Sequence, residues 1–267
     1  EVFRLEHESI FYRTWWYQCH ETDVPDPGDY HAGEIADQGV VVIRGLDGEI
    51  RAFYNVCSHR AHPLVEGCGG SRLLVCPYHQ WVYGKDGKLL SCRGMQDGLD
   101  TGALGLSPVA TENLCGFIFV NLAKQPGDFG PARELIEPML RPQGCDRAKV
   151  AKTVNYTVHS NWKLVWENNR ECYHCNVNHP QYIKANFDHF NSDDTTPRVQ
   201  ERIDAAATRH AVQCAKHELE VTHKETGMAT FPGPEHGLWF SANRTTLTEG
   251  YVSESMDGQQ VAPLMGN

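Results

Sequence analysis

The sequence has 267 residues, of which 40% are hydrophobic and 10% aromatic, enough apolar material for one large domain or two modest ones. Its 34 acidic and 24 basic residues give a net charge of -10, and this balance argues against nucleic acid or an anionic membrane as the main partner. It has no apolar run of the roughly eighteen residues that a membrane helix needs, so we expect a cytoplasmic protein that does not span a membrane.

The sequence contains 10 cysteines. In a chain of this composition we expect metal ligands and reduced thiols rather than disulfides. Six cysteines have no metal-binding pattern around them, and we expect them to be small buried side chains: Cys19, Cys68, Cys92, Cys115, Cys145 and Cys214.

The first part of the chain predicts a short helix followed by β-structure. Apolar residues recur at helical spacing over residues 1–13. The segments 40–43 and 50–54 read as strands joined by a hairpin at Asp47-Gly48. The second strand leads directly into Cys57.

Two short loops each combine a thiol with an imidazole, Cys57-Ser58-His59 and Cys76-Pro77-Tyr78-His79. Thiolates and imidazoles together suit iron–sulfur clusters and zinc. The alternating C-x-H and C-x-x-H order favours a Rieske [2Fe–2S] cluster, in which two Cys bind one iron and two His bind the other. The alternative is a structural zinc site, although zinc fingers usually pair Cys with Cys and His with His.

Further antiparallel strands are predicted around these loops. Residues 66–70 are rich in glycine and read as a flexible connector. A second hairpin is predicted at Asp86-Gly87, and residues 116–121 read as a closing strand. Residues of about 15 to 122 therefore predict a small antiparallel β domain whose hairpin tips carry the two loops.

The second part of the chain predicts both helices and strands. Residues 132–140 read as a helix, and the alternation of apolar residues over 149–159 predicts a strand. Ser160 or Asn161 could then serve as the N-cap of a further helix.

Two histidines in this second part, His174 and His179, suggest another metal site. A spacing of five places them about 140° apart on an ideal α-helix, so they could share a metal only if the helix distorts or ends between them. Pro180 permits such an end. Two His and a carboxylate would form the facial triad of a non-haem Fe(II) oxygenase, whereas Cys172 and Cys175 offer a competing zinc site.

With both motifs in view, the chain resembles the alpha subunits of Rieske non-haem iron oxygenases over nearly its whole length. The matching segments are Cys57-Ser58-His59-Arg60, Cys76 to Trp81, and Asn161-Trp162-Lys163 through Glu167-Asn168 to His179-Pro180. This resemblance implies an α+β protein, with a small antiparallel β Rieske domain and a helix-on-sheet catalytic domain. We expect residues 1–13 to belong with the catalytic domain, 14–125 to form the Rieske domain, and 126–267 to form a catalytic domain that is incomplete at its C-terminus.

The resemblance also implies the ligands. Cys57 and Cys76 would bind one cluster iron, and His59 and His79 the other. His174 and His179 would bind a mononuclear Fe(II), whose third ligand, a carboxylate, we expect further along than this sequence reaches.

In the family an Asp usually bridges the iron site to the Rieske cluster of a neighbouring subunit, and Glu171 occupies that position here. Glu171 is one methylene longer and can still hydrogen-bond an imidazole. Asn168, in the same motif, is carried over as a further site residue. A homotrimer is the assembly that the resemblance implies.

The run from Glu167 to Cys175 looks most like the branch that oxidises quaternary ammonium compounds, such as stachydrine, glycine betaine and carnitine. The expected reaction is N-demethylation with O₂ and electrons from NAD(P)H through a separate flavin and iron–sulfur reductase. Aromatic residues could enclose the cationic group, with Trp166, Trp239, Phe240 and Tyr251 as candidates. The alternatives are a ring-hydroxylating dioxygenase and a Rieske electron-transfer protein without oxygenase activity.

Overall fold

The computed structural model divides into two compact units, which comprise, among the described residues, 1–152 and those from 153 on. It describes residues 1–96, 98–170, 174–185, 195–216, 227–230, 241–244 and 248. No helix in this part of the chain is long and apolar enough to cross a membrane.

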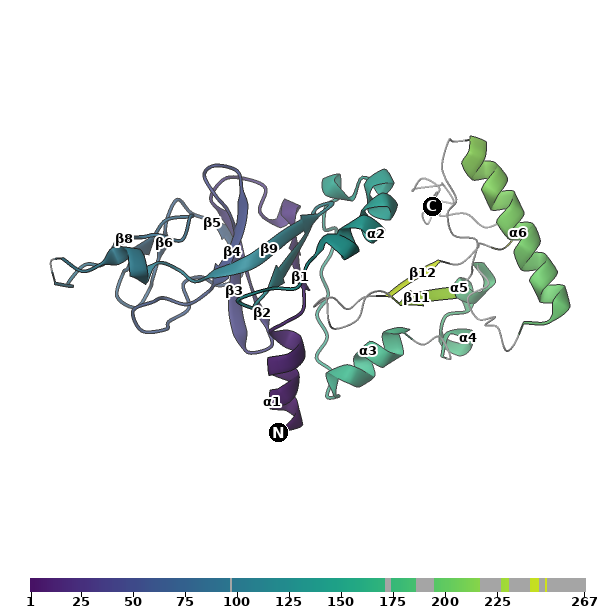
Figure 1. The fold of residues 1–267 in the computed structure, drawn as a ribbon, viewed down its shortest axis with the longest axis horizontal. Helices are drawn as coiled ribbons and strands as arrows, with labels where there is room; N and C mark the ends of the chain where they lie inside the picture. Colours follow the sequence, from purple (N-terminus) through teal and green to yellow (C-terminus); the bar gives the residue numbers. More distant parts are fainter. Residues whose placement is uncertain are drawn as a thin grey trace. The chain divides into compact units, whose positions relative to one another are not determined.

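The first unit is built mainly of antiparallel strands (Figure 1). Seven strands form one sheet in the order β1-β10-β9-β4-β3-β2-β5, and three form a second sheet in the order β6-β7-β8. The strands are β1 Trp16–His20, β2 Asp29–Ile35, β3 Gln38–Arg44, β4 Ile50–Tyr54, β5 Cys68–Gly70, β6 Leu74–Val75, β7 Val82–Tyr83, β8 Leu89–Ser91, β9 Pro108–Leu114 and β10 Phe117–Asn121. The predicted small antiparallel β domain is therefore present.

The seven-stranded sheet curls until its two edges approach. β1 is an edge strand, yet it contacts β2 near the opposite edge, where the side chain of Gln18 fills the space beside Gly33. A short 3-10 helix, η2 (Glu21–Asp23), follows β1 and also contacts β2. We call this junction of β1 and η2 with β2 and β5 the barrel seam.

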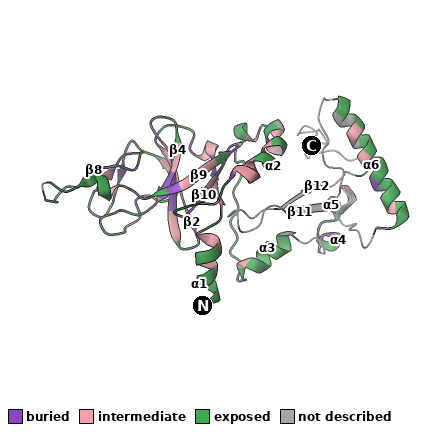
Figure 2. Ribbon diagram, viewed as in Figure 1, coloured by how far each residue is buried: buried purple, intermediate pink, exposed green. Residues whose placement is uncertain are grey.

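The central strand β3 supplies side chains to two separate cores. Val41 and Ile43 point into the core that contains Cys57 and Cys76, while Val40 and Val42 belong to a second core on the other face. All four β3 side chains are fully buried. Because alternate residues of a strand face opposite sides, this continuous apolar run indicates a strand that is covered on both faces. Figure 2 shows buried residues, in purple, on the strands of the first unit.

Both predicted hairpins are confirmed. Gly48 and Gly87 have φ of 87° and 82°, which glycine adopts without strain. They lie in the turns between β3 and β4 and between β7 and β8. Residues 66–70 were expected to be a flexible connector, and that expectation is wrong, because Cys68–Gly70 pairs with β2 as β5.

The N-terminal helix, α1 (Val2–Glu6), continues as a π-helix, η1 (His7–Phe11). Phe11 and Tyr12 pack against the core of the first unit, and the Trp16 indole donates a hydrogen bond of 2.9 Å to the Phe11 carbonyl. The assignment of residues 1–13 to the catalytic domain stays a prediction, as does the boundary at 125.

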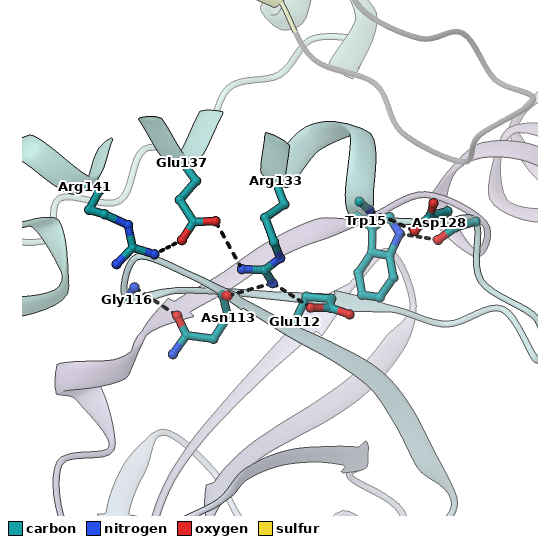
Figure 3. A network of polar contacts seen from close by, with 10 residues as sticks. Trp15, Glu112, Asn113, Gly116, Asp128, Arg133, Glu137 and Arg141 are labelled. Atoms are coloured by element: carbon teal, nitrogen blue, oxygen red, sulfur yellow. Dashed lines mark hydrogen bonds and ion pairs between the residues drawn. The ribbon is translucent and has the colours of Figure 1, made fainter. Parts of the chain in front are cut away.

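Helix α2 (Gly130–Leu140) confirms the helix expected at 132–140 and is held to β9 by polar contacts (Figure 3). The Arg133 guanidinium donates to the Glu112 carboxylate at 2.8 Å and to the Asn113 carbonyl at 2.9 Å. Glu137, one turn along, pairs with Arg133 and Arg141. Three 3-10 helices complete this unit: η3 Thr101–Leu104, η4 Arg141–Gln143 and η5 Cys145–Arg147.

In its described residues the second unit combines helices with a pair of strands, so the predicted α+β class is confirmed. Its elements are α3 Trp162–Arg170, α4 Cys175–Asn178, α5 Pro180–Ala185, α6 Pro197–Lys216, and the antiparallel pair β11 Gly227–Thr230 and β12 Ser241–Arg244. Asn161 is the N-cap that was expected for α3, because its Oδ1 accepts a hydrogen bond of 3.0 Å from the Lys163 N–H.

The prediction of a strand at 149–159 is wrong. Residues 150–158 form no strand, and the alternating apolar side chains, including Tyr156 at 83% exposure, lie exposed. Within the described residues no other strand pairs with this segment. Alternation alone is not enough, because a strand also needs a neighbour to satisfy its backbone N–H and C=O groups.

Candidate functional site

The first candidate loop is closed by backbone hydrogen bonds around Cys57. The Cys57 N–H donates to the His62 carbonyl, and the Ala61 N–H donates to the Cys57 carbonyl, both at 2.9 Å. Ala61 has a positive φ of 54°, which turns the chain back on itself.

The second loop repeats this pattern around Cys76. The Cys76 N–H donates to the Trp81 carbonyl at 2.8 Å, and the Gln80 N–H donates to the Cys76 carbonyl at 2.9 Å. Gln80, like Ala61, has a positive φ, here 58°. Two unrelated stretches of sequence thus form matching turns, each with a cysteine at its base.

The thiols lie inward and the imidazoles outward. Cys57 and Cys76 are each 1% exposed, whereas His59 is half-buried and His79 is exposed. The two imidazole rings lie with their centroids 4.6 Å apart, and His59 stacks on Trp81 at 4.8 Å. This order matches a Rieske cluster, with the Cys-bound iron inside and the His-bound iron outside.

One ring nitrogen supports the fit directly. Nδ1 of His59 is buried and has no hydrogen-bond partner among the described residues. A buried polar atom without a partner is costly, and a bond from this nitrogen to iron would remove the cost. Loss of hydration, and then electrostatic repulsion from His59 and Arg60, lower the pKa of His79 and so favour its neutral form.

Tyr83, on β7, contacts the first loop and was not anticipated as a site residue. Its hydroxyl lies 3.2 Å from the Cys57 Sγ and accepts a hydrogen bond from the Ser58 N–H at 3.1 Å. The Ser58 hydroxyl donates to the Leu104 carbonyl at 2.6 Å, so the Tyr83 proton has two acceptors, the Ser58 Oγ at 2.9 Å and the Cys57 Sγ at 3.2 Å. Burial, and then the contact with Cys57, raise the pKa of Tyr83 to about 12, so it keeps this proton at neutral pH.

The sequence does contain a signal for Tyr83. In the extended run Trp81-Val82-Tyr83, the first and third residues must share a face. Trp81 and Tyr83 are 2% and 0% exposed, and both face the core that holds the two cysteines.

The second candidate site brings His174 and His179 together. α4 ends at Asn178, and His179 has φ −127° and ψ 58°, outside the helical region. The two imidazole centroids lie 5.3 Å apart. The helix therefore ends between the two histidines. Two histidines five residues apart need such an end if they are to share a metal.

Other expected site residues are only partly described. Asn168 lies on α3 and is exposed, as is Trp166. Glu171 and Cys172 lie outside the described residues, as do the proposed cage residues Trp239, Phe240 and Tyr251.

The motif-free cysteines are less uniform than expected. Cys19 is buried as predicted, but Cys68 is exposed, and the partly buried ones are Cys92, Cys115 and Cys145. Cys175 is part of a disulfide, which corrects the expectation of thiols alone and removes it from a zinc site with the two histidines.

Comparison with known proteins identifies both halves. Residues 14–103 match the Rieske [2Fe-2S] domain, and residues 145–253 match the ring hydroxylating alpha subunit (catalytic domain). The glycine betaine monooxygenase oxygenase subunit of Chromohalobacter salexigens is 37% identical over 268 residues, covering 99% of this chain and 58% of that protein. The carnitine monooxygenase oxygenase subunit of Acinetobacter baumannii is 33% identical over 192 residues, covering 69% of this chain and 51% of that protein.

A solved structure agrees with these relatives. The crystal structure of the quaternary ammonium Rieske monooxygenase CntA in complex with L-carnitine aligns with a TM-score of 0.63 and 32% identity, over 68% of this chain and 53% of that chain. The chain thus spans a little more than half the length of the relatives that it matches.

Proposed function

Because the chain carries both domains of the Rieske non-haem iron oxygenase alpha subunits and belongs to that family, we propose that it N-demethylates a betaine-type quaternary ammonium compound. The observation that carries the proposal is the 37% identity to a glycine betaine monooxygenase subunit across 99% of this chain. Stachydrine, glycine betaine and carnitine are the candidate substrates.

In this proposal the chain holds two metal centres. Cys57, Cys76, His59 and His79 hold the [2Fe–2S] cluster, and His174 and His179 hold Fe(II) together with a carboxylate that this sequence does not identify. When bound, the cluster supplies single electrons and the Fe(II) supplies O₂ activation. The buried cysteines keep water from the inner side of the cluster, while exposed His79 offers an outer edge from which an electron can leave.

The overall chemistry balances with one O₂. An N-methyl C–H bond becomes C–OH, which consumes O₂, two electrons and two protons and releases one water. The resulting hemiaminal then breaks its C–N bond to give formaldehyde and the demethylated amine. NAD(P)H, through a separate flavin and iron–sulfur reductase, would supply the two electrons in the cytoplasm.

The remaining parts of the proposal concern the assembly. Glu171 would link His79 of one subunit to the iron site of its neighbour by hydrogen bonds, as carboxylates do when they orient a ligating imidazole. A homotrimer would place these groups across each interface. Asn168 would act near the iron.

The test is an assay of the purified protein with a reductase, in which O₂ consumption and formaldehyde are both measured. We expect formaldehyde in proportion to O₂ with at least one N-methylated betaine, and none with arenes. Ring diols from arenes without formaldehyde would instead establish the ring-hydroxylating alternative. Two irons per chain rather than three would establish the electron-transfer alternative.

A further inference from the structure

Four side chains of types that bind metals lie at the barrel seam, and none of them belongs to either candidate site. Ligand atoms of Cys19, Asp23 and His31 all lie within 4.8 Å of one another. Cys68 approaches the same place, with its Sγ 3.1 Å from the Nδ1 of His31. The four residues come from β1, η2, β2 and β5.

Local backbone features direct these side chains toward each other. The pairing of β1 with β10 shifts register between Tyr17 and Cys19, and such a bulge re-aims the side chains that follow. Cys19 is consequently 2% exposed. His31 and Cys68 are direct partners in the pairing of β2 with β5, so their side chains lie on one face.

The carboxylate of Asp23 is also held in place by the backbone. Its Oδ2 accepts a hydrogen bond of 3.0 Å from the His20 N–H, in the capping box that begins η2. This bond fixes the carboxylate.

We propose that Cys19, Asp23, His31 and Cys68 bind a structural Zn²⁺ ion that joins the two edges of the sheet. Two thiolates, one imidazole and one carboxylate form a four-coordinate set of the ligand types that zinc uses. Zinc bonds of about 2.0–2.3 Å place neighbouring ligand atoms roughly 3.3–3.8 Å apart in a tetrahedron. The ligand atoms of Cys19, Asp23 and His31, which lie within 4.8 Å of one another, therefore need only small movements to close on the ion.

The ligand types and their positions argue for zinc and for a structural role. Thiolates select zinc over magnesium or calcium, which prefer oxygen ligands. Four protein ligands leave no open position for a substrate. An ion at the seam would tie β1 and η2 to β2 and β5, and so stabilise the curled sheet. The central strand of this sheet, β3, contributes Val41 and Ile43 to the core that contains Cys57 and Cys76 of the two cluster loops.

The experiment is to measure zinc in the purified, cluster-loaded protein after EDTA dialysis, re-addition of zinc and desalting. We expect one zinc per chain, with sulfur scatterers at about 2.3 Å and lighter scatterers near 2.0 Å in zinc K-edge absorption, to which iron is invisible. Cys68→Ser, which alters an exposed side chain and so spares the core, should bind zinc at least about 100-fold more weakly.

Two matched controls separate this site from others. Cys115→Ser changes a partly buried thiol outside the group and should retain the zinc. The double variant His174→Ala/His179→Ala should also retain it, which excludes zinc bound at the expected iron site. The proposal is overturned by zinc retained equally in Cys68→Ser, by a zinc spectrum without sulfur, by no retained zinc at all, or by a Cys19–Cys68 disulfide in the purified protein.

Discussion

Tyr83 shows how one hydroxyl can set the properties of the proposed cluster. Ser58 uses its own hydroxyl on the Leu104 carbonyl and its N–H on the Tyr83 oxygen, so the Tyr83 hydroxyl donates and its proton is shared between the Ser58 Oγ at 2.9 Å and the Cys57 Sγ at 3.2 Å. A cysteine bound to the cluster is a thiolate, and its negative charge draws the proton toward the sulfur. A reduced cluster carries one more negative charge than an oxidised one. A hydrogen bond to its sulfur therefore stabilises the reduced state more, and raises the reduction potential.

Tyr83→Phe should accordingly lower the cluster potential. A differential hydrogen-bond energy of about 1.4 kcal/mol corresponds to roughly 59 mV for a one-electron couple, and hydrogen bonds to charged groups are of this order. The measurement is a potentiometric titration followed by the electron paramagnetic resonance signal of the cluster. Tyr54→Phe is the control, because its hydroxyl donates to the Leu122 carbonyl at 3.1 Å in the other core. Equal potentials in Tyr83→Phe and the wild type would contradict the assignment.

At the scale of single elements, the proposed iron site depends on where one helix stops. His174 precedes α4 and His179 follows it, and Pro180 begins α5. The residue before a proline is disfavoured in the α region. His179 accordingly leaves the helical conformation, and its ring comes to lie near that of His174.

Pro180→Ala removes this restriction, so α4 and α5 can fuse into one helix that carries the two imidazoles about 140° apart. We expect Fe(II) affinity to fall by about 10- to 100-fold, as when other supports of a metal ligand are lost. Competition with a colorimetric iron chelator measures this affinity, while the cluster signal reports an intact first unit. Pro197→Ala, at the first residue of α6, should leave iron affinity unchanged. A fully retained affinity in Pro180→Ala would show that the proline does not hold the site.

The elements that sequence predicted well are those fixed by local chemistry. Asp47-Gly48 and Asp86-Gly87 specify tight turns through glycine's positive φ, and Asn161 specifies a helix start through its side-chain oxygen. These signals do not depend on distant parts of the chain.

The errors arose where a distant partner decides the outcome. Cys68–Gly70 is a strand because β2 lies beside it, although its glycines favour a loop. Residues 150–158 alternate like a strand but have no partner strand within the described chain. For the same reason Cys68 was expected to be buried, since its position at a sheet edge cannot be read from neighbouring residues. Tyr83 was missed because its contact with Cys57 spans 26 residues.

At the scale of the whole molecule, the two sets of proposed ligands lie in different units. The cluster residues belong to the first unit and the histidine pair to the second. A ring of three subunits has identical head-to-tail interfaces, so the first unit of each subunit can face the second unit of the next. The proposed homotrimer would then carry electrons across interfaces, from His79 of one subunit through Glu171 of its neighbour.

Subunit mixing tests this route. His79→Ala should lose the cluster and His179→Ala the iron, and both side chains are exposed, so neither change disturbs a core. Each variant alone should be inactive. In a mixed trimer of either composition, one of the three interfaces has a cluster-bearing donor facing an iron-bearing acceptor. Mixed trimers isolated through two different affinity tags should therefore recover about one third of the wild-type rate of formaldehyde release.

The rate of the mixed trimers distinguishes electron transfer between subunits from electron transfer within one chain, because the two routes predict different rates. Neither variant chain has both centres, so an intra-chain path gives no activity in any mixture. Glu171→Gln, introduced only into the His179→Ala chain, tests the bridge itself. In the proposed route that glutamate would serve only the iron site that His179→Ala has disabled, so its loss should leave the recovered rate unchanged. The same substitution in the His79→Ala chain, which holds the working iron site, should abolish most of the rate.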